Sequence, residues 1–340
     1  MVYISFLAKK NKEIEAYINN FAISLVFLGS ITLNLIIISY YTPKSIDFIV
    51  FPFDIFMLFF IIFFLPLFYL LIIREKKRLK RGSEQPYYPK KDLPLKYDLY
   101  RKLTHLVVLA IILFYFTLGF LVKNFFVYLL NFFPEMISEI FYTLYNIEED
   151  TMIFTQYLVV FLVGISLIGL LTADFIRILK PKIYPLKPVN QILREKELYL
   201  RLGPQISMAI GCFSIIILYG IFQPIGPLVI CVSMTMAIFS DMASTLVGRS
   251  IGYKYKNIRN TKKTYIGLFA GIIIAFFSGI IILYLLKDFF LISPICYYII
   301  PLIGAIIIGL LDYLDFEIDD NLSYNICLST ILFVTMKFIL

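Results

Sequence analysis

The chain has 340 residues, of which 60% are hydrophobic and only 16% are charged, and its formal net charge is +8. Apolar runs such as residues 53–73 have no place in a water-soluble domain, whereas they match the roughly 20 residues that a helix needs to cross a bilayer. The composition therefore excludes a soluble globular protein and predicts an all-α, polytopic bundle of transmembrane helices.

About nine segments are long and apolar enough to be predicted as spans. They lie at residues 19–41, 48–73, 103–122, 152–173, 205–222, 227–247, 264–287, 293–312 and 324–340. The first two spans and the basic tail before them make an N-terminal unit over residues 1–80, and the rest belongs to a larger unit over residues 81–340. Residues 125–145 hold a proline and two glutamates, which favours an interfacial or re-entrant helix over a further span.

The basic residues predict the orientation, because short cytoplasmic loops carry an excess of lysine and arginine. With nine spans and a cytoplasmic N-terminus, all but four of the 31 lysines and arginines fall on one side. The exceptions are Lys44, Lys123, Lys287 and Lys337. A basic cytoplasmic face suits anionic headgroups or a polyphosphate, and no nucleic acid is expected as a partner.

The first polar motif is YDLYRKLTHL, residues 97–106, at the start of the third span. Helical spacing places Asp98, Arg101, Lys102 and His105 on about one face of a helix that enters the membrane. A single histidine at a helix start is often structural. The neighbouring arginine and lysine favour a role for His105 beside a bound anion.

The loop after the fourth span carries two charged stretches, TADFIRI at residues 172–178 and LREKELYLRLGP at residues 193–204. Three prolines between them prevent the loop from being a single helix. Taken alone, this set of charges is typical of a solvated surface whose ion pairs are internal to the loop.

Residues 240–267, SDMASTLVGRSIGYKYKNIRNTKKTYIG, are the most informative segment. Asp241 follows a long apolar helix, where an unpaired carboxylate would cost about 2.5 to 3.5 kcal/mol. Small and polar residues follow Asp241 on one face of that helix. Spaced glycines and then lysines occupy the end of the helix and the loop after it. These residues are Ser244, Thr245, Gly248, Gly252, Lys254, Lys256, Lys262 and Lys263. Glycines admit a close backbone approach and lysines bring positive charge, so the segment predicts an anion site at the membrane surface.

The last polar cluster, residues 311–325, holds five carboxylates and no lysine or arginine. Asp319, Asp320 and Asn321 offer hard oxygen ligands that suit Mg²⁺, or a carboxylate that polarises a hydroxyl. The alternative is a charged stop at a helix end.

Together these blocks resemble the dolichol kinase and phytol kinase family of CTP-dependent lipid kinases, which includes diacylglycerol kinases and is distantly related to phosphatidate cytidylyltransferases. The resemblance covers residues 98 to about 325 in the same order, through RKLTH, the middle loop, the 240–267 segment with Lys263, Thr264 and Gly267, and IDDNL at 318–322. Ile266 stands where many members carry a glutamate, and Asp98 replaces the usual glutamate before the arginine and lysine.

The resemblance implies phosphoryl transfer from CTP to the hydroxyl of an isoprenoid alcohol at the cytoplasmic face. Mg²⁺ is then expected on Asp241, Asp319 and Asp320. The nucleotide site is expected to comprise Asp241, Ser244, Gly248, Gly252, Lys254, Lys262, Lys263, Thr264 and Gly267. Arg101, Lys102, His105 and Asp320 are expected to act in catalysis, and either His105 or one of the acids to take the hydroxyl proton. Two alternatives stay open: a CTP:lipid-phosphate cytidylyltransferase with the same nucleotide site, and a transporter, whose charges would lie nearer mid-membrane.

Overall fold

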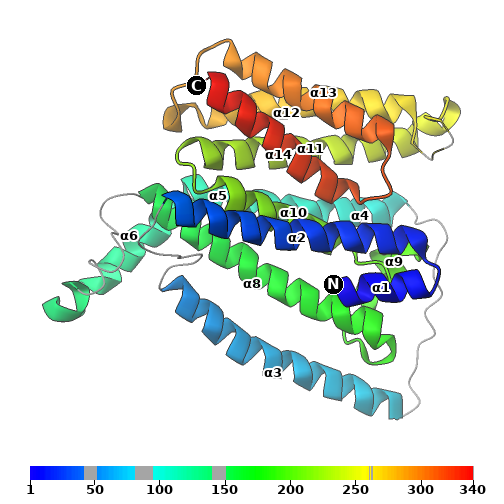
Figure 1. Cartoon of the computed structure of the whole chain (residues 1–340), viewed down its shortest axis with the longest axis horizontal. Helices are drawn as coiled ribbons and strands as arrows, with labels where there is room; N and C mark the ends of the chain where they lie inside the picture. Colours follow the sequence, from blue (N-terminus) through cyan, green and yellow to red (C-terminus); the bar gives the residue numbers. More distant parts are fainter. Residues whose placement is uncertain (42–51, 81–94, 140–150, 260, 262, 340) are drawn as a thin grey trace.

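The computed structural model describes residues 1–41, 52–80, 95–139, 151–259, 261 and 263–339. The described residues are 84% helical and contain no strand, which confirms the predicted all-α class. Figure 1 shows the long helices side by side in one bundle, with both chain ends against it.

The long helices alternate in direction along the bundle, while α4, α5 and α6 follow one another in the same direction (Figure 1). They are α1 (Val2–Lys10), α2 (Ile14–Tyr41), α3 (Phe53–Lys80), α4 (Leu95–Leu106), α5 (Ala110–Phe116), α6 (Leu118–Leu130), α8 (Thr151–Leu179), α9 (Glu195–Leu198), α10 (Pro204–Tyr219), α11 (Ile225–Ser250), α12 (Tyr265–Leu285), α13 (Cys296–Leu314) and α14 (Asp320–Ile339). A single 3-10 turn, Val107–Leu109, joins α4 to α5.

Among the described residues, eight helices are long and apolar enough to cross a membrane, with α4 and α5 counting as one. The chain is thus an integral multi-pass membrane protein. One predicted span, residues 205–222, is not among these eight. It corresponds to α10, which has only 16 residues. Twelve of these residues are buried, so α10 lies within the bundle and need not match the lipid thickness itself.

The bundle is centred on α11, which is buried along most of its length as far as Asp241. It packs most extensively on α12 and also contacts α14 and α10. Three helix starts (α2, α4 and α12) and the α13–α14 turn lie at the end of the bundle where α11 finishes (Figure 1). This arrangement brings the polar segments of the chain together at one end.

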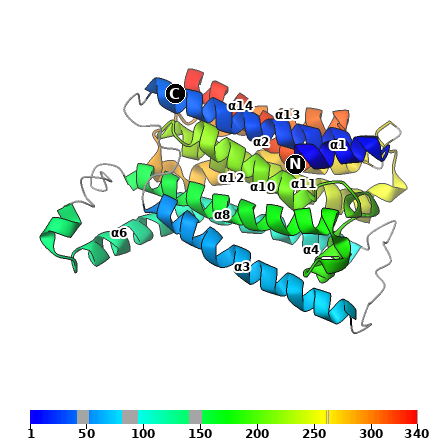
Figure 2. The same cartoon turned by 60° about the horizontal axis from the view of Figure 1, so that its bottom comes forward.

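The N-terminal unit is divided between the centre and the edge of the bundle. Ile4 of α1 and Ile23 of α2 belong to the same buried core as α10 and α11. By contrast, α3 lies along the outside, against α8 (Figure 2). Helices α1 and α2 thus pack with the core of the bundle, whereas α3 packs at its edge.

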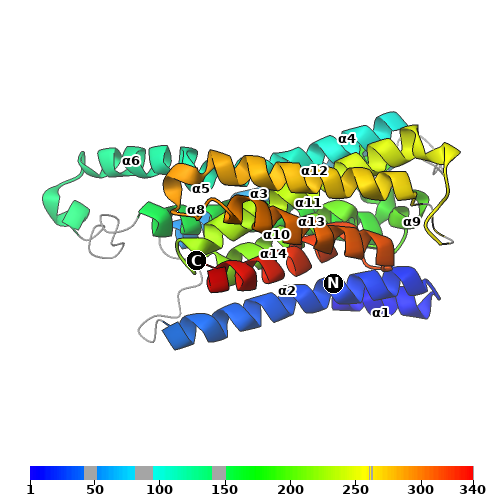
Figure 3. The ribbon, with the colours of Figure 1, turned by 90° about the horizontal axis from the view of Figure 1, so that it is seen from above.

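The segment after α5 leaves the bundle. The chain breaks its helix at Thr117, so the span predicted for residues 103–122 ends at Phe116. From there α6 contacts the start of α8 and then projects beyond the end of the bundle, as seen from above (Figure 3). Residues 125–130 of the predicted interfacial helix lie in α6, and residues 140–145 lie outside the described residues.

The contact between α11 and α12 depends on glycine. A Cβ atom on Gly267 would lie 2.7 Å from the backbone oxygen of Ser244 and 3.1 Å from the Cα atom of Gly248. We expect Gly267→Ala to push the two helices apart and to cost about 1–3 kcal/mol, as overpacking of a core does. Thermal unfolding of the detergent-solubilised protein measures this effect. Gly29→Ala on α2 is the matched control, because a Cβ there meets nothing within 4 Å; an equal loss of stability in both variants would contradict the prediction.

Candidate functional site

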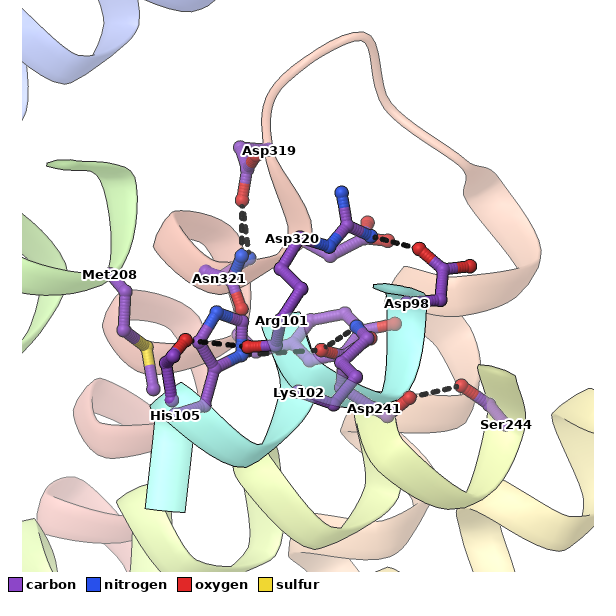
Figure 4. Close-up of polar contacts among 12 residues, drawn as sticks. Asp98, Arg101, Lys102, His105, Met208, Asp241, Ser244, Asp319, Asp320 and Asn321 are labelled. Carbon is purple, nitrogen blue, oxygen red and sulfur yellow. Dashed lines mark hydrogen bonds and ion pairs between the residues drawn. The ribbon is translucent and has the colours of Figure 1, made fainter. Parts of the chain in front are cut away.

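Two groups of ionisable side chains lie near each other at the end of the bundle where α11 finishes. The first, here called the Lys102 cluster, comprises Lys102, His105 and Asp241. The second, the Lys263 cluster, comprises Lys263, Asp312, Asp315 and Asp320. Asp320 of the second cluster interacts electrostatically with Asp241 of the first, and Figure 4 draws both residues. Residues from α4, α11, α13 and α14 and from the loop before α12 thus meet in one place.

The Lys102 cluster is built on the inward face of α4. Asp98, Arg101, Lys102 and His105 are all at most 5% exposed, so the face that helical spacing predicts is turned into the protein. The ammonium of Lys102 donates a hydrogen bond to Oδ2 of Asp241, and Nδ1 of His105 lies 3.9 Å from the same oxygen (Figure 4). The lysine supplies the countercharge that the buried carboxylate of Asp241 requires.

Arg101 has a different partner from its neighbour. Its guanidinium lies 3.1 Å from Glu197 on α9 and 3.4 Å from Asp98. The Asp98 carboxylate also pairs with Arg249 at the end of α11 and, at 3.6 Å, with Arg194. These contacts connect α4 to α9 and α11, so Arg101 holds the helix that carries Lys102 rather than contacting Asp241.

The middle loop is buried where its charges meet the bundle. Arg177, Glu197 and Arg201 are each at most 5% exposed, so a solvated surface is the wrong description of these residues. Arg177 of α8 pairs with Asp174 at 2.6 Å and donates hydrogen bonds to the backbone oxygens of Glu197 and Arg201. The sequence analysis did not select Glu197, although the charged LREKE run was the signal for it.

In the Lys263 cluster one ammonium group contacts three carboxylates. Nζ of Lys263 lies 2.9 Å from Asp312, 2.9 Å from Asp315 and 3.0 Å from Asp320. Burial alone would lower the pKa of Lys263, but the carboxylates of Asp320 and Asp312 outweigh it and raise that pKa above its ordinary value. Asp312 also accepts a hydrogen bond from the hydroxyl of Tyr324 at 2.9 Å. Lys263 is therefore held as a fixed positive charge.

Asp312 and Asp315 are site residues that the sequence analysis did not single out. They stand three residues apart where α13 ends, and Asp315 caps that helix in the left-handed conformation, with φ of 46°. The spacing puts both carboxylates at the same end of α13. That pattern was visible in the sequence, whereas their partner Lys263 lies far away in the chain.

The three predicted metal ligands have separate partners. Asp241 pairs with Lys102 and Asp320 with Lys263, while Oδ1 of Asp319 accepts hydrogen bonds from the backbone and side-chain amides of Asn321 at 3.0 and 2.7 Å. Carboxylates are the right donors for Mg²⁺. Within the described residues, however, no three histidine, cysteine or acidic side chains are grouped so that they could hold a metal ion. The arrangement does not fit a magnesium site built by the protein alone.

The glycines of the 240–267 segment pack against protein atoms. A Cβ on Gly252 would lie 2.4 Å from Oγ1 of Thr264, and one on Gly248 would lie 3.2 Å from the same atom. That hydroxyl oxygen also caps α12 by accepting a hydrogen bond from the amide of Gly267 at 3.2 Å. Ser244 donates to the backbone oxygen of Asp241 at 3.3 Å. These residues shape the join between α11 and α12 that carries the lysines.

The loop after α11 presents its lysines unevenly. Lys254 is the last residue of a short 3-10 turn at Gly252–Lys254 and its side chain is exposed, as is that of Lys256. Lys263 lies inward, three-quarters buried, in the cluster described above. Lys262 lies outside the described residues.

One buried nitrogen of the site has no hydrogen-bond partner among the described residues. It is Nε2 of His105, a residue that is 3% exposed. A neutral imidazole has one donor and one acceptor nitrogen. Nδ1 faces Asp241 at 3.9 Å, so a proton on Nδ1 would leave Nε2 as the acceptor nitrogen.

Comparison with known proteins gives no match to a family model, to a curated protein or to a solved structure. The resemblance to lipid kinases therefore rests on the sequence blocks themselves, and the functional argument rests on the site geometry.

Proposed function

We propose that the protein is a CTP-dependent lipid kinase that phosphorylates the hydroxyl of an isoprenoid alcohol. One observation carries the proposal: the Lys102–Asp241 ion pair is buried at the place where all the kinase-like blocks of the sequence meet. Buried ion pairs are weak devices for stability, because desolvation offsets much of their attraction. Their concentration at one end of an apolar bundle is better explained by the handling of a charged substrate.

Phosphoryl transfer requires positive charge near the phosphates and correct positioning of the substrates, rather than a covalent intermediate with the enzyme. In phosphoryl transfer, the lipid hydroxyl oxygen forms a bond to the γ-phosphorus while the bond from that phosphorus to the β-phosphate oxygen breaks, which releases CDP. Lys102 and Lys263 are placed to exchange their carboxylate partners for phosphate oxygens. Nε2 of His105 accepts the hydroxyl proton.

The membrane explains how the second substrate arrives. An isoprenoid tail stays in the bilayer while its hydroxyl reaches the polar end of the bundle. We assign that end to the cytoplasm because the basic loops of the chain gather there. A cytoplasmic site also has access to soluble nucleotide.

The test is transfer of labelled phosphate by the purified protein. CTP labelled at the γ-phosphate is supplied with Mg²⁺ and with geranylgeraniol, dolichol, phytol or diacylglycerol, and we expect label in an isoprenoid monophosphate. A parallel reaction with α-labelled CTP and lipid phosphates detects the cytidylyltransferase alternative, which would form a CDP-lipid and pyrophosphate. Label that never leaves the γ-position of CTP for a lipid would refute the kinase.

A further inference from the structure

Two adjacent asparagines of α2 form hydrogen bonds with the two loops that adjoin the clusters of the candidate site. Asn19 and Asn20 are both 0% exposed, although asparagine is costly to bury without hydrogen bonds. They lie on a helix outside the part of the chain that resembles lipid kinases. We infer that Asn19 and Asn20 are positioning residues, which hold the α9–α10 and α13–α14 loops so that Lys102 and Lys263 stay in place for phosphoryl transfer.

Asn20 holds the α9–α10 loop through both ends of its amide. Its Nδ2 donates to the backbone oxygen of Leu200 at 2.7 Å, and its Oδ1 accepts from the backbone amide of Leu202 at 2.9 Å. Leu202 is completely buried, so its amide has no access to water and requires a partner. Asn20 thus satisfies backbone groups that no helix or strand satisfies.

The α8 side of the same loop is held in the same manner. Asp174 accepts from the amide of Gly203 at 3.1 Å, and Arg177 donates to the backbone oxygens of Glu197 and Arg201 at 2.7 and 2.9 Å. The loop is therefore held by hydrogen bonds to α2 on one side and to α8 on the other. Glu197 at its start then reaches Arg101, the neighbour of Lys102, so displacement of the loop displaces α4.

Asn19 makes the equivalent contact with the α13–α14 loop, beside the Lys263 cluster. Its Oδ1 accepts from the backbone amide of Asp319 at 2.9 Å, immediately before Asp320, which contacts Lys263. Arg201 joins the two loops by donating to the backbone oxygen of Glu317 at 3.3 Å. A single turn of α2 therefore fixes the relative position of the two lysines.

This inference rests on the proposed kinase function, and its test compares three alanine variants on one helix. Asn34→Ala is the matched control, because Asn34 is 2% exposed on α2 and donates to the backbone oxygen of Ile217, on α10. We expect Asn20→Ala and Asn19→Ala to lower kcat about tenfold or more, since small misplacements of catalytic groups are costly. The KM for the lipid alcohol should stay within about twofold, and Asn34→Ala should leave both constants near wild type.

Two further measurements separate positioning from general loss of structure. If Asn20 acts through Glu197, the effects of Asn20→Ala and Glu197→Gln on kcat should be strongly non-additive, as for residues in one network. Hydrogen exchange should quicken at the amide of Leu202 in Asn20→Ala and at that of Asp319 in Asn19→Ala, but at neither in Asn34→Ala.

The possible failures are distinguishable. A wild-type protein that transfers no phosphate from CTP refutes the proposed function. An active wild type in which all three asparagine variants lose kcat equally, or none does, refutes the positioning inference alone. Unchanged exchange at Leu202 in Asn20→Ala refutes the inference whatever the activity of the protein.

Discussion

Replacing Asp241 with asparagine should lower the rate of phosphate transfer about a hundredfold, the usual effect of removing one electrostatic element from an active site. Asp241 accepts from Lys102 and faces His105, so the change removes the countercharge that fixes both side chains. It also leaves the ammonium of Lys102, only 4% exposed, without its carboxylate. Transfer of γ-labelled phosphate at saturating CTP and lipid measures the effect.

A second variant separates chemistry from folding in this prediction. Loss of one partner from a buried ion pair destabilises by about 3–5 kcal/mol, whereas an apolar replacement of both is often neutral. Asp241→Leu combined with Lys102→Met replaces both charges by apolar side chains and should therefore recover much of the lost unfolding temperature while transfer stays low. Glu75→Gln on the peripheral helix α3 breaks a contact with Arg78 of 3.0 Å and should leave transfer near wild type. Recovery of transfer in the double variant would disprove the assignment of Asp241 and Lys102.

The face of α4 and the need of Asp241 for a partner were both predictable from local sequence. Helical periodicity alone orients Asp98, Lys102 and His105 together, because residues three and four apart share a face. A carboxylate at the end of an apolar helix predicts a cation near it, because an unpaired charge there is costly. The amino-acid sequence does not say which cation, and the structure supplies Lys102, which is far from Asp241 along the chain.

The contacts that escaped prediction are those between distant segments. Glu197 belongs to a charged run that is typical of a solvated loop, and only its packing against α4 shows that Arg101 is its partner. Spaced glycines likewise have two explanations, a close ligand or a close helix. Gly267 faces the backbone of α11, so in this protein the second explanation accounts for its lack of a side chain.

Replacing Lys263 with alanine should also lower phosphate transfer about a hundredfold, because it removes a fixed positive charge from the proposed phosphate site. The change leaves Asp312, Asp315 and Asp320 near one another without the cation that they share, so the unfolding temperature should fall as well. Lys263→Arg retains the charge but spreads it over a planar group, and should keep more stability than activity. Lys256→Ala, at an exposed lysine of the same loop, should change neither quantity.

The pH dependence of protein stability tests whether Lys263 is permanently charged, as the Lys263→Ala prediction assumes. The pKa of Lys263 in the folded protein is raised above the ordinary 10.5, so its stabilising contribution is complete below that pH and is lost only as the pH rises through the higher, folded value. The stability difference between wild type and Lys263→Ala should therefore contain no step from lysine titration at neutral or mildly alkaline pH. Such a step, or near-normal transfer by Lys263→Ala, would show that Lys263 is not the permanently charged group on which the proposed phosphate site depends.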